Sequence, residues 1–159
     1  MKPYFAPAAL ALAATLVPVS AIAQTRFCMG GDLDHLSQTD RAACSATVQA
    51  VRNAASSMHA PDGWHFVVVC GEDGWKSYAA FSTHSEDILE NASADTNREE
   101  QTTYFREDRL HTPQAHGLQR VVAHEVASIL LKTDDESTIQ TQMATWERQS
   151  NVQEASLQR

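Results

Sequence analysis

The most constraining feature of the sequence is a stretch of helical spacing, residues 117–136. Apolar side chains recur there at steps of three and four residues, the period of a helix with a broad apolar face. The dipeptide His124-Glu125 lies in the middle of the stretch, one turn before Ser128. The pattern therefore predicts one helix that packs on the rest of the chain and carries polar groups at its centre. The apolar positions are Leu118, Val121, Val122, Val126, Ile129 and Leu130.

Residues 1–23 have the pattern of a secretory signal peptide. Lys2 supplies a short positive region, residues 8–19 form an apolar run that is short for a membrane span, and residues 21–23 (Ala-Ile-Ala) fit a cleavage site. A retained anchor is the alternative, and the short run ending in small residues disfavours it. We expect a mature chain that starts at Gln24 and is secreted or periplasmic.

The remaining residues have the length of one domain with one core. We assign this domain to residues 24–148 and a polar tail to residues 149–159. The net charge of the full chain is −8, which argues against nucleic acid and anionic membranes as partners, since both favour clustered Lys and Arg. After cleavage we expect no membrane segment. A peptide or protein is the partner we consider, and the sequence gives no indication of the oligomeric state.

Three cysteines, Cys28, Cys44 and Cys70, follow the predicted cleavage site. In an oxidising compartment, three cysteines predict one disulfide and one free thiol. We favour the pair Cys28–Cys44, which would link the N-terminal loop to the first helix. Cys44–Cys70 is also feasible, because a helix face and a core strand often touch.

The rest of the chain alternates between helical and strand patterns. Residues 64–70 (W-H-F-V-V-V-C) form the strongest strand pattern, a β-branched and aromatic run typical of a strand buried on both faces. Either Ser37 or Thr39 is expected to cap the first helix. This succession predicts an α+β fold in which helices pack on a small mixed sheet of three to four strands. In chain order we predict a loop over 24–36, a helix over 39–58, strands over 64–70, 75–82 and 101–106, a helical turn over 85–90, and a helix over 117–136. Residues 137–148 are expected to form either another helix or a turn followed by a helix.

Residues 120–131, which contain His124-Glu125-Val126-Ala127-Ser128, resemble the active-site helix of the zincins. Zincins are metallopeptidases in which H-E-x-x-H places two His ligands on one helix face, with the Glu as base. Residues 102–106 resemble the strand before that helix, and Met143 resembles the Met-turn of the matrixin and metzincin branch. The resemblance covers roughly residues 39–146. It implies a zincin-like fold, zinc as the cofactor and peptide hydrolysis as the activity.

The resemblance also implies a role for each position of the motif. His124 matches the first zinc ligand, Glu125 the general base and Ser128 the second-ligand position, while Glu136 matches the third ligand. Catalytic zinc normally has three protein ligands and a water, and a neutral serine hydroxyl is a poor zinc donor. Zinc affinity and the supply of metal-bound hydroxide are both expected to fall. Replacement ligands to consider are His111, His116 and Cys70, with Asp134 and Asp135 as alternatives to Glu136.

Three hypotheses follow from these patterns. The first is an exported zincin-like protein that is catalytically impaired or inactive and keeps the fold as a binding module. The second is an active zinc metallopeptidase that uses a substitute second ligand. The third is a secreted binding domain without zincin ancestry, which a structure lacking a strand beside the His124 helix would favour.

Overall fold

The computed structural model describes residues 24–111 and 117–157, so the predicted signal peptide and His116 lie outside the described residues. A four-stranded mixed sheet forms its centre, in the order β1-β2-β4-β3. β1, β2 and β4 run parallel, and β3 pairs with β4 antiparallel at one edge. The strands are β1 (Arg26–Gly30), β2 (His65–Val69), β3 (Ala94–Asn97) and β4 (Thr102–Arg106).

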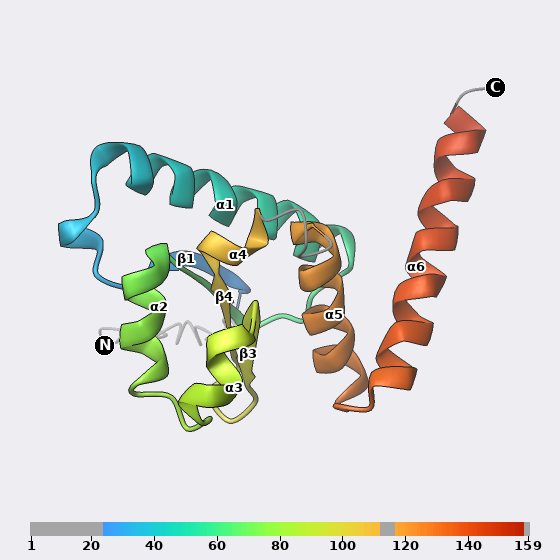
Figure 1. Ribbon diagram of the computed structural model, residues 1–159. Coiled ribbons are helices and arrows are strands. Elements are labelled where there is room, and N and C mark those ends of the chain that lie inside the picture. The colour runs from blue at the N-terminus through green and yellow to red at the C-terminus, as the bar shows by residue number, and fades with distance from the viewer. Residues whose placement is uncertain (1–23, 112–116, 158–159) are drawn as a thin grey trace, which may run out of the picture.

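Helices cover both faces of the sheet (Figure 1). The main core lies between one face and helices α1 and α5, while a smaller cluster of Val69, Trp75 and Leu89 lies under α2 and α3 on the other face. This arrangement confirms the predicted α+β class with a small mixed sheet. The helices are a 3-10 turn (Leu33–His35), α1 (Gln38–Ser57), α2 (Gly71–Ala79), α3 (Glu86–Asn91), α4 (Glu107–Leu110), α5 (Leu118–Leu131) and α6 (Glu136–Leu157).

The strongest sequence patterns form the core. β2 is central in the sheet, and Phe66 in it is fully buried, as is Phe105 in β4. Burial of one such ring contributes about 2 to 3 kcal/mol to folding. Ser37 caps α1, because its side chain accepts a hydrogen bond from the backbone N–H of Asp40 at 3.1 Å.

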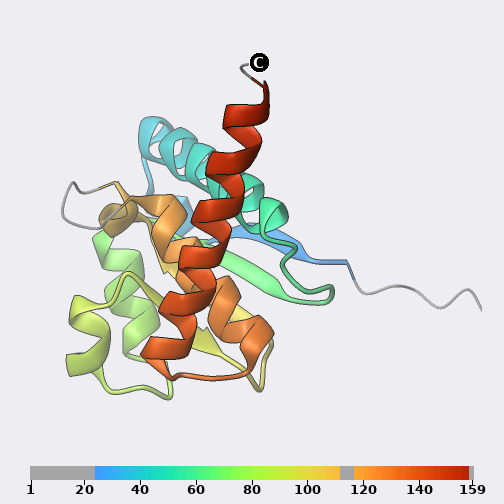
Figure 2. The ribbon, with the colours of Figure 1, turned by 90° about the vertical axis from the view of Figure 1, so that its right-hand side faces the viewer.

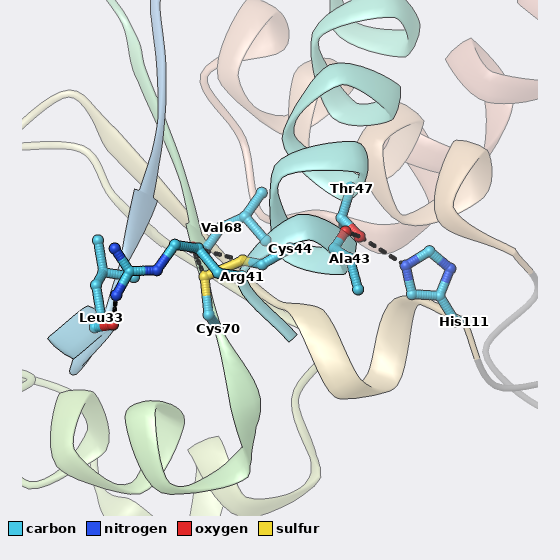
Figure 3. Close-up of a disulfide and its surroundings, with 8 residues drawn as sticks. All are labelled: Leu33, Arg41, Ala43, Cys44, Thr47, Val68, Cys70 and His111. Carbon is cyan, nitrogen blue, oxygen red and sulfur yellow. Dashed lines mark hydrogen bonds between the residues drawn. A yellow bond between two sulfur atoms is a disulfide. The ribbon is translucent and has the colours of Figure 1, made fainter. Parts of the chain in front are cut away.

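The disulfide joins Cys44 in α1 to Cys70 at the end of β2 (Figure 3). The favoured pair Cys28–Cys44 is therefore wrong, and Cys28 is an exposed free thiol. Its neighbours Phe27 and Met29 pack against the core under α1, and alternation along a strand turns Cys28 to the opposite face. The observed bond spans 26 residues and holds α1 on the sheet, a constraint of about 3 to 4 kcal/mol.

Three other features differ from the predictions. The expected loop over 24–36 contains β1, and β3 is a strand where none was expected. The expected strand over 75–82 is mostly α2, because Trp75 and Tyr78 are one helical turn apart and pack together, with ring centroids 5.0 Å apart.

The C-terminal helix is longer than expected. α6 runs to Leu157, so the predicted polar tail from residue 149 continues the helix. Its first half packs on α5 through Ile139 and Met143, and the rest extends past the body of the protein (Figures 1 and 2). Met143 is thus a buried helical residue, not part of a turn. In the described part of the chain, no helix has the length and apolar character needed to cross a membrane.

Candidate functional site beside helix α5

The centre of α5 faces both the core and a polar cavity. Val122 and Val126 are fully buried against the sheet and α1, while His124, Glu125 and Ser128 line a cavity of about 550 Å³. The remaining walls come from β3 and the turn after it, from the segment between α2 and α3, and from the start of α6. We call this the α5–β3 cavity; it is lined by Thr83, His84, Ala94, Asp95, Thr96, Asn97, Arg98, Glu99, His124, Glu125, Ser128, Asp134 and Ile139.

Glu125 is held by a chain of hydroxyl groups. Its Oε2 accepts a hydrogen bond from Thr96 Oγ1 at 2.7 Å. Thr96 Oγ1 lies 2.9 Å from Thr103 Oγ1, which in turn accepts from Trp64 Nε1 at 3.0 Å. Burial raises the pKa of the Glu125 carboxyl, while the Thr96 hydrogen bond and the nearby charge of His124 act in the opposite direction. The carboxyl therefore binds a proton more readily than a solvated glutamate does.

His124 lies near Glu136, the residue that matches the third zinc ligand in the zincin resemblance. Its Nδ1 lies 3.8 Å from Oε2 of Glu136, the first residue of α6. The imidazole is one-third exposed and the carboxylate is mostly exposed, so the contact contributes at most about 1 kcal/mol. Two predicted ligand positions, from two helices, thus lie close together.

Ser128 contacts a cation that the sequence patterns do not reveal. Arg98, just after β3, donates through Nη2 to Ser128 Oγ at 2.9 Å and to the Thr133 carbonyl at 3.0 Å. Its Nη1 donates to the Ser128 carbonyl at 3.2 Å, and the guanidinium also forms an ion pair with Asp134. A fixed positive charge therefore stands beside the second-ligand position of the motif.

The replacement ligands that lie within the described residues have other partners. Asp135 caps α6 by accepting from the Thr138 N–H at 2.9 Å, and hydrogen bonds from Thr138 and Ser137 lower the pKa of its carboxyl. His111 Nε2 bonds to Thr47 Oγ1 on α1 at 2.7 Å (Figure 3), and Cys70 is in the disulfide.

The donor set does not fit a zinc ion. Over residues 24–111 and 117–157, no group of three or more His, Cys, Asp or Glu side chains is arranged to hold a metal. Of the ligands that the resemblance implies, His124 and Glu136 lie near each other, but Ser128, at the remaining position, already accepts a hydrogen bond from Arg98. Zinc binding remains a prediction from the resemblance alone.

A buried carboxylate forms the wall opposite α5. Asp95 in β3 accepts hydrogen bonds from the Tyr78 hydroxyl and from Ser82 Oγ, the latter at 3.3 Å, and it lies 2.8 Å from His84 Nδ1. Burial, followed by the hydrogen bond to Asp95, raises the pKa of Tyr78 far above its usual value. Sequence reasoning missed Asp95, His84 and Arg98. The only sequence signal for Asp95 and Arg98 was their place in the polar run 95–100 before the predicted strand, and polar runs are common in loops.

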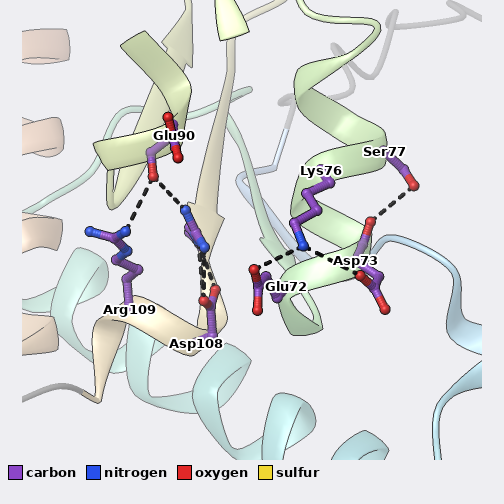
Figure 4. Close-up of polar contacts among 8 residues, drawn as sticks. Glu72, Asp73, Lys76, Ser77, Glu90, Asp108 and Arg109 are labelled. Atoms are coloured by element: carbon purple, nitrogen blue, oxygen red, sulfur yellow. Dashed lines mark hydrogen bonds and ion pairs between the residues drawn. The ribbon is translucent and has the colours of Figure 1, made fainter. Parts of the chain in front are cut away.

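A second charged cavity, of about 350 Å³, lies between α2, α3 and the end of β4. We call it the α2–α3 cavity. Lys76 Nζ lies 2.9 Å from Glu72 Oε1, and Arg109 donates to the Glu90 carbonyl (Figure 4). Arg106 donates through Nε to Asp108 at 2.9 Å and through Nη1 to the same Glu90 carbonyl. Its lining residues are Glu72, Trp75, Lys76, Ala79, Asp87, Glu90, Arg106 and Arg109.

No protein family, curated protein or solved structure matches this chain.

Proposed function

We propose that this chain is an exported, zincin-like protein without metallopeptidase activity, and that it uses the α5–β3 cavity as a binding site. Three features support zincin ancestry. A strand, β3, lies beside the helix that carries His124, and the imidazole and Glu125 line the same cavity. An acidic residue, Glu136, reaches the imidazole from the next helix. A fold without a strand at this position would have favoured an unrelated binding domain.

The contact between Arg98 and Ser128 carries the proposed loss of catalysis. A zinc ion held by His124 would require a lone pair from residue 128, and Ser128 Oγ already uses one of its two lone pairs to accept from the guanidinium at 2.9 Å. A second cation at that distance would also repel Zn²⁺ in a site of reduced dielectric. The cavity thus contains an internal cation where the resemblance places a metal.

The disulfide supports export. Cys44 and Cys70 are both almost completely buried and bonded to each other, as expected for a protein that folds in an oxidising compartment. Together with the leader pattern of residues 1–23, this supports secretion to the periplasm or beyond. Intact mass measurement of the exported protein tests the expected start at Gln24.

Metal titration of a matched set of variants tests the proposed function. We expect the purified wild type to hold no tightly bound zinc and to show no peptide hydrolysis that depends on Glu125. Ser128→His alone should gain little zinc affinity, because Arg98 remains. Ser128→His combined with Arg98→Met should gain about tenfold or more, since a ligand is restored and a cation removed.

An active enzyme would give the opposite pattern. Wild-type protein with one zinc per chain, and hydrolysis that Glu125→Gln abolishes, would contradict the proposal. The contact between His124 and Glu136 is the observation that favours this second function. Arg98→Met is the control, because removing the cation alone leaves the ligand set incomplete.

A further inference from the structure

The α5–β3 cavity has an excess of negative groups that its own cation does not balance. Arg98 is held against one wall by Ser128 and paired with Asp134. Glu99 and Glu125 have no salt-bridge partner among the described residues. The carboxyl groups of the lining belong to Asp95, Glu99, Glu125 and Asp134. Its basic groups are the guanidinium of Arg98 and the imidazoles of His84 and His124, and His84 Nδ1 lies 2.8 Å from Asp95.

Glu125 provides an acceptor with a fixed direction. Its Oε2 is held by Thr96, whereas Oε1 has no hydrogen bond to the described residues. No buried polar side-chain atom in the described part of the chain lacks a partner, so Oε1 is not completely buried, and Glu125 is one of the residues that line the cavity. A carboxylate oxygen held in this way is a strong acceptor for a charged N–H donor.

The cavity also suits an alkyl chain behind the charge. Ala94 and Ile139 contribute apolar surface to walls that are otherwise polar, and the volume of about 550 Å³ accommodates a long side chain. Outside the lining, Phe81 is 91% exposed and directly precedes Ser82, which binds Asp95. Long cationic side chains bury their methylene groups on such surfaces and keep the charged end on a polar partner.

We infer, building on the proposed binding role, that the α5–β3 cavity binds an ammonium or guanidinium group at the end of an alkyl chain, the group that lysine and arginine carry. Oε1 of Glu125 accepts from the cation, and Glu99 at the rim adds attraction. The ligand is either a basic side chain of another protein or a free linear diamine, because both carry this group.

Calorimetric titration of the mature protein in EDTA tests this inference. The probes are a capped Gly-Gly-Lys-Gly-Gly peptide, the same peptide with norleucine in place of lysine, and 1,5-diaminopentane. We expect the lysine peptide to bind about tenfold more tightly than the norleucine peptide, because a charge-assisted hydrogen bond is lost in the latter. If the lysine peptide binds more tightly than the diamine, the site is supported and the ligand is a side chain of another protein. If the diamine binds more tightly, the site is supported and the ligand is a small amine.

Variants locate the site. Glu125→Gln should weaken the lysine peptide about tenfold, and Glu99→Gln, at an exposed position outside the core, about twofold to threefold. Glu72→Gln, in the α2–α3 cavity, is the matched control and should leave affinity unchanged. Equal affinity for lysine and norleucine, or no binding of either amine, overturns the inference. So does full affinity in both Glu125→Gln and Glu99→Gln.

The proposed function fails in a different way. Its failure appears as zinc binding and Glu125-dependent hydrolysis in protein not treated with EDTA. If the protein is metal-free and inactive and also binds neither amine, the proposed loss of catalysis is supported. Only the inferred cation site is then contradicted.

Discussion

The two charged cavities of this protein have similar residue types and different internal pairing. In the α2–α3 cavity, Arg106 binds Asp108 through two nitrogens and lies over Trp75, 5.9 Å from the ring centroid, and Lys76 is paired with Glu72. In the α5–β3 cavity, Glu125 accepts from one hydroxyl group and has no ion pair among the described residues, although the charges of His124 and Arg98 act on it from beyond ion-pair distance. Charged residues around a cavity therefore do not by themselves indicate a binding site. What distinguishes a binding site from a structural one is charge that the protein leaves unbalanced.

The largest effect is expected from removing the paired cation of the α2–α3 cavity. Arg106→Met removes a buried guanidinium, which leaves Asp108 without its cation and the Glu90 carbonyl with Arg109 as its remaining side-chain donor. Loss of one partner of a buried pair should lower the free energy of unfolding by about 3 kcal/mol. Urea unfolding followed by circular dichroism measures it. Arg109→Met, at the more exposed neighbouring position, should change stability much less, and an equally large loss there would remove the distinction.

The matched change in the α5–β3 cavity should have a smaller effect. Arg98→Met removes hydrogen bonds to Ser128 and Thr133, but its ion pair with Asp134 is largely exposed. We expect a loss of about 1 kcal/mol in the same urea experiment. A loss as large as that of Arg106→Met would mean that Arg98 is a structural residue of the same kind. The contrast between the cavities would then fail.

The elements that sequence predicts well are those with a strong period of their own. α1, α5 and β2 have continuous apolar patterns. The observed bounds of α1 and β2 lie within one residue of the predicted ones, whereas α5 starts within one residue of the prediction but ends at Leu131, five residues earlier than expected. β1 and β3 were missed because they are edge strands. β3 in particular is short and polar, and it is defined by pairing with β4 across a turn in which Asn97 Oδ1 accepts from the N–H groups of Glu99 and Glu100.

The candidate site likewise has one part that the sequence predicts and one part that it does not. Residues on one helix turn, His124, Glu125 and Ser128, share a cavity as their spacing predicts. Arg98 and Asp95 reach the cavity through the β3–β4 hairpin, at a sequence distance of about 30 residues from Glu125 or Ser128, and no local period encodes that approach. Charge pairing is therefore the part of the site that required a structure.

The smallest stability effect, and one of opposite sign, is expected at Glu125. Glu125→Gln keeps the shape and the hydrogen bond from Thr96 but removes a carboxyl whose pKa is raised by burial. A carboxyl with a raised pKa contributes most to stability below the pKa of the unfolded chain, and that contribution is lost as pH rises through the folded value. The glutamine does not titrate. The variant should therefore match the wild type near pH 4 and melt a few degrees higher near pH 8.

Thermal unfolding at both pH values, without added amine or metal, measures this difference. Glu72→Gln is the control, since its carboxylate is paired with Lys76 and hydrogen bonding to that ammonium lowers its pKa. The control variant should show no gain at pH 8, because the carboxylate it replaces is stabilised in the folded protein. If Glu125→Gln instead melts lower than the wild type at pH 8, the ionised Glu125 must already have a balancing partner. Both cavities would then have carboxylates that the protein itself balances. There would be no reason to expect a cationic ligand at Glu125.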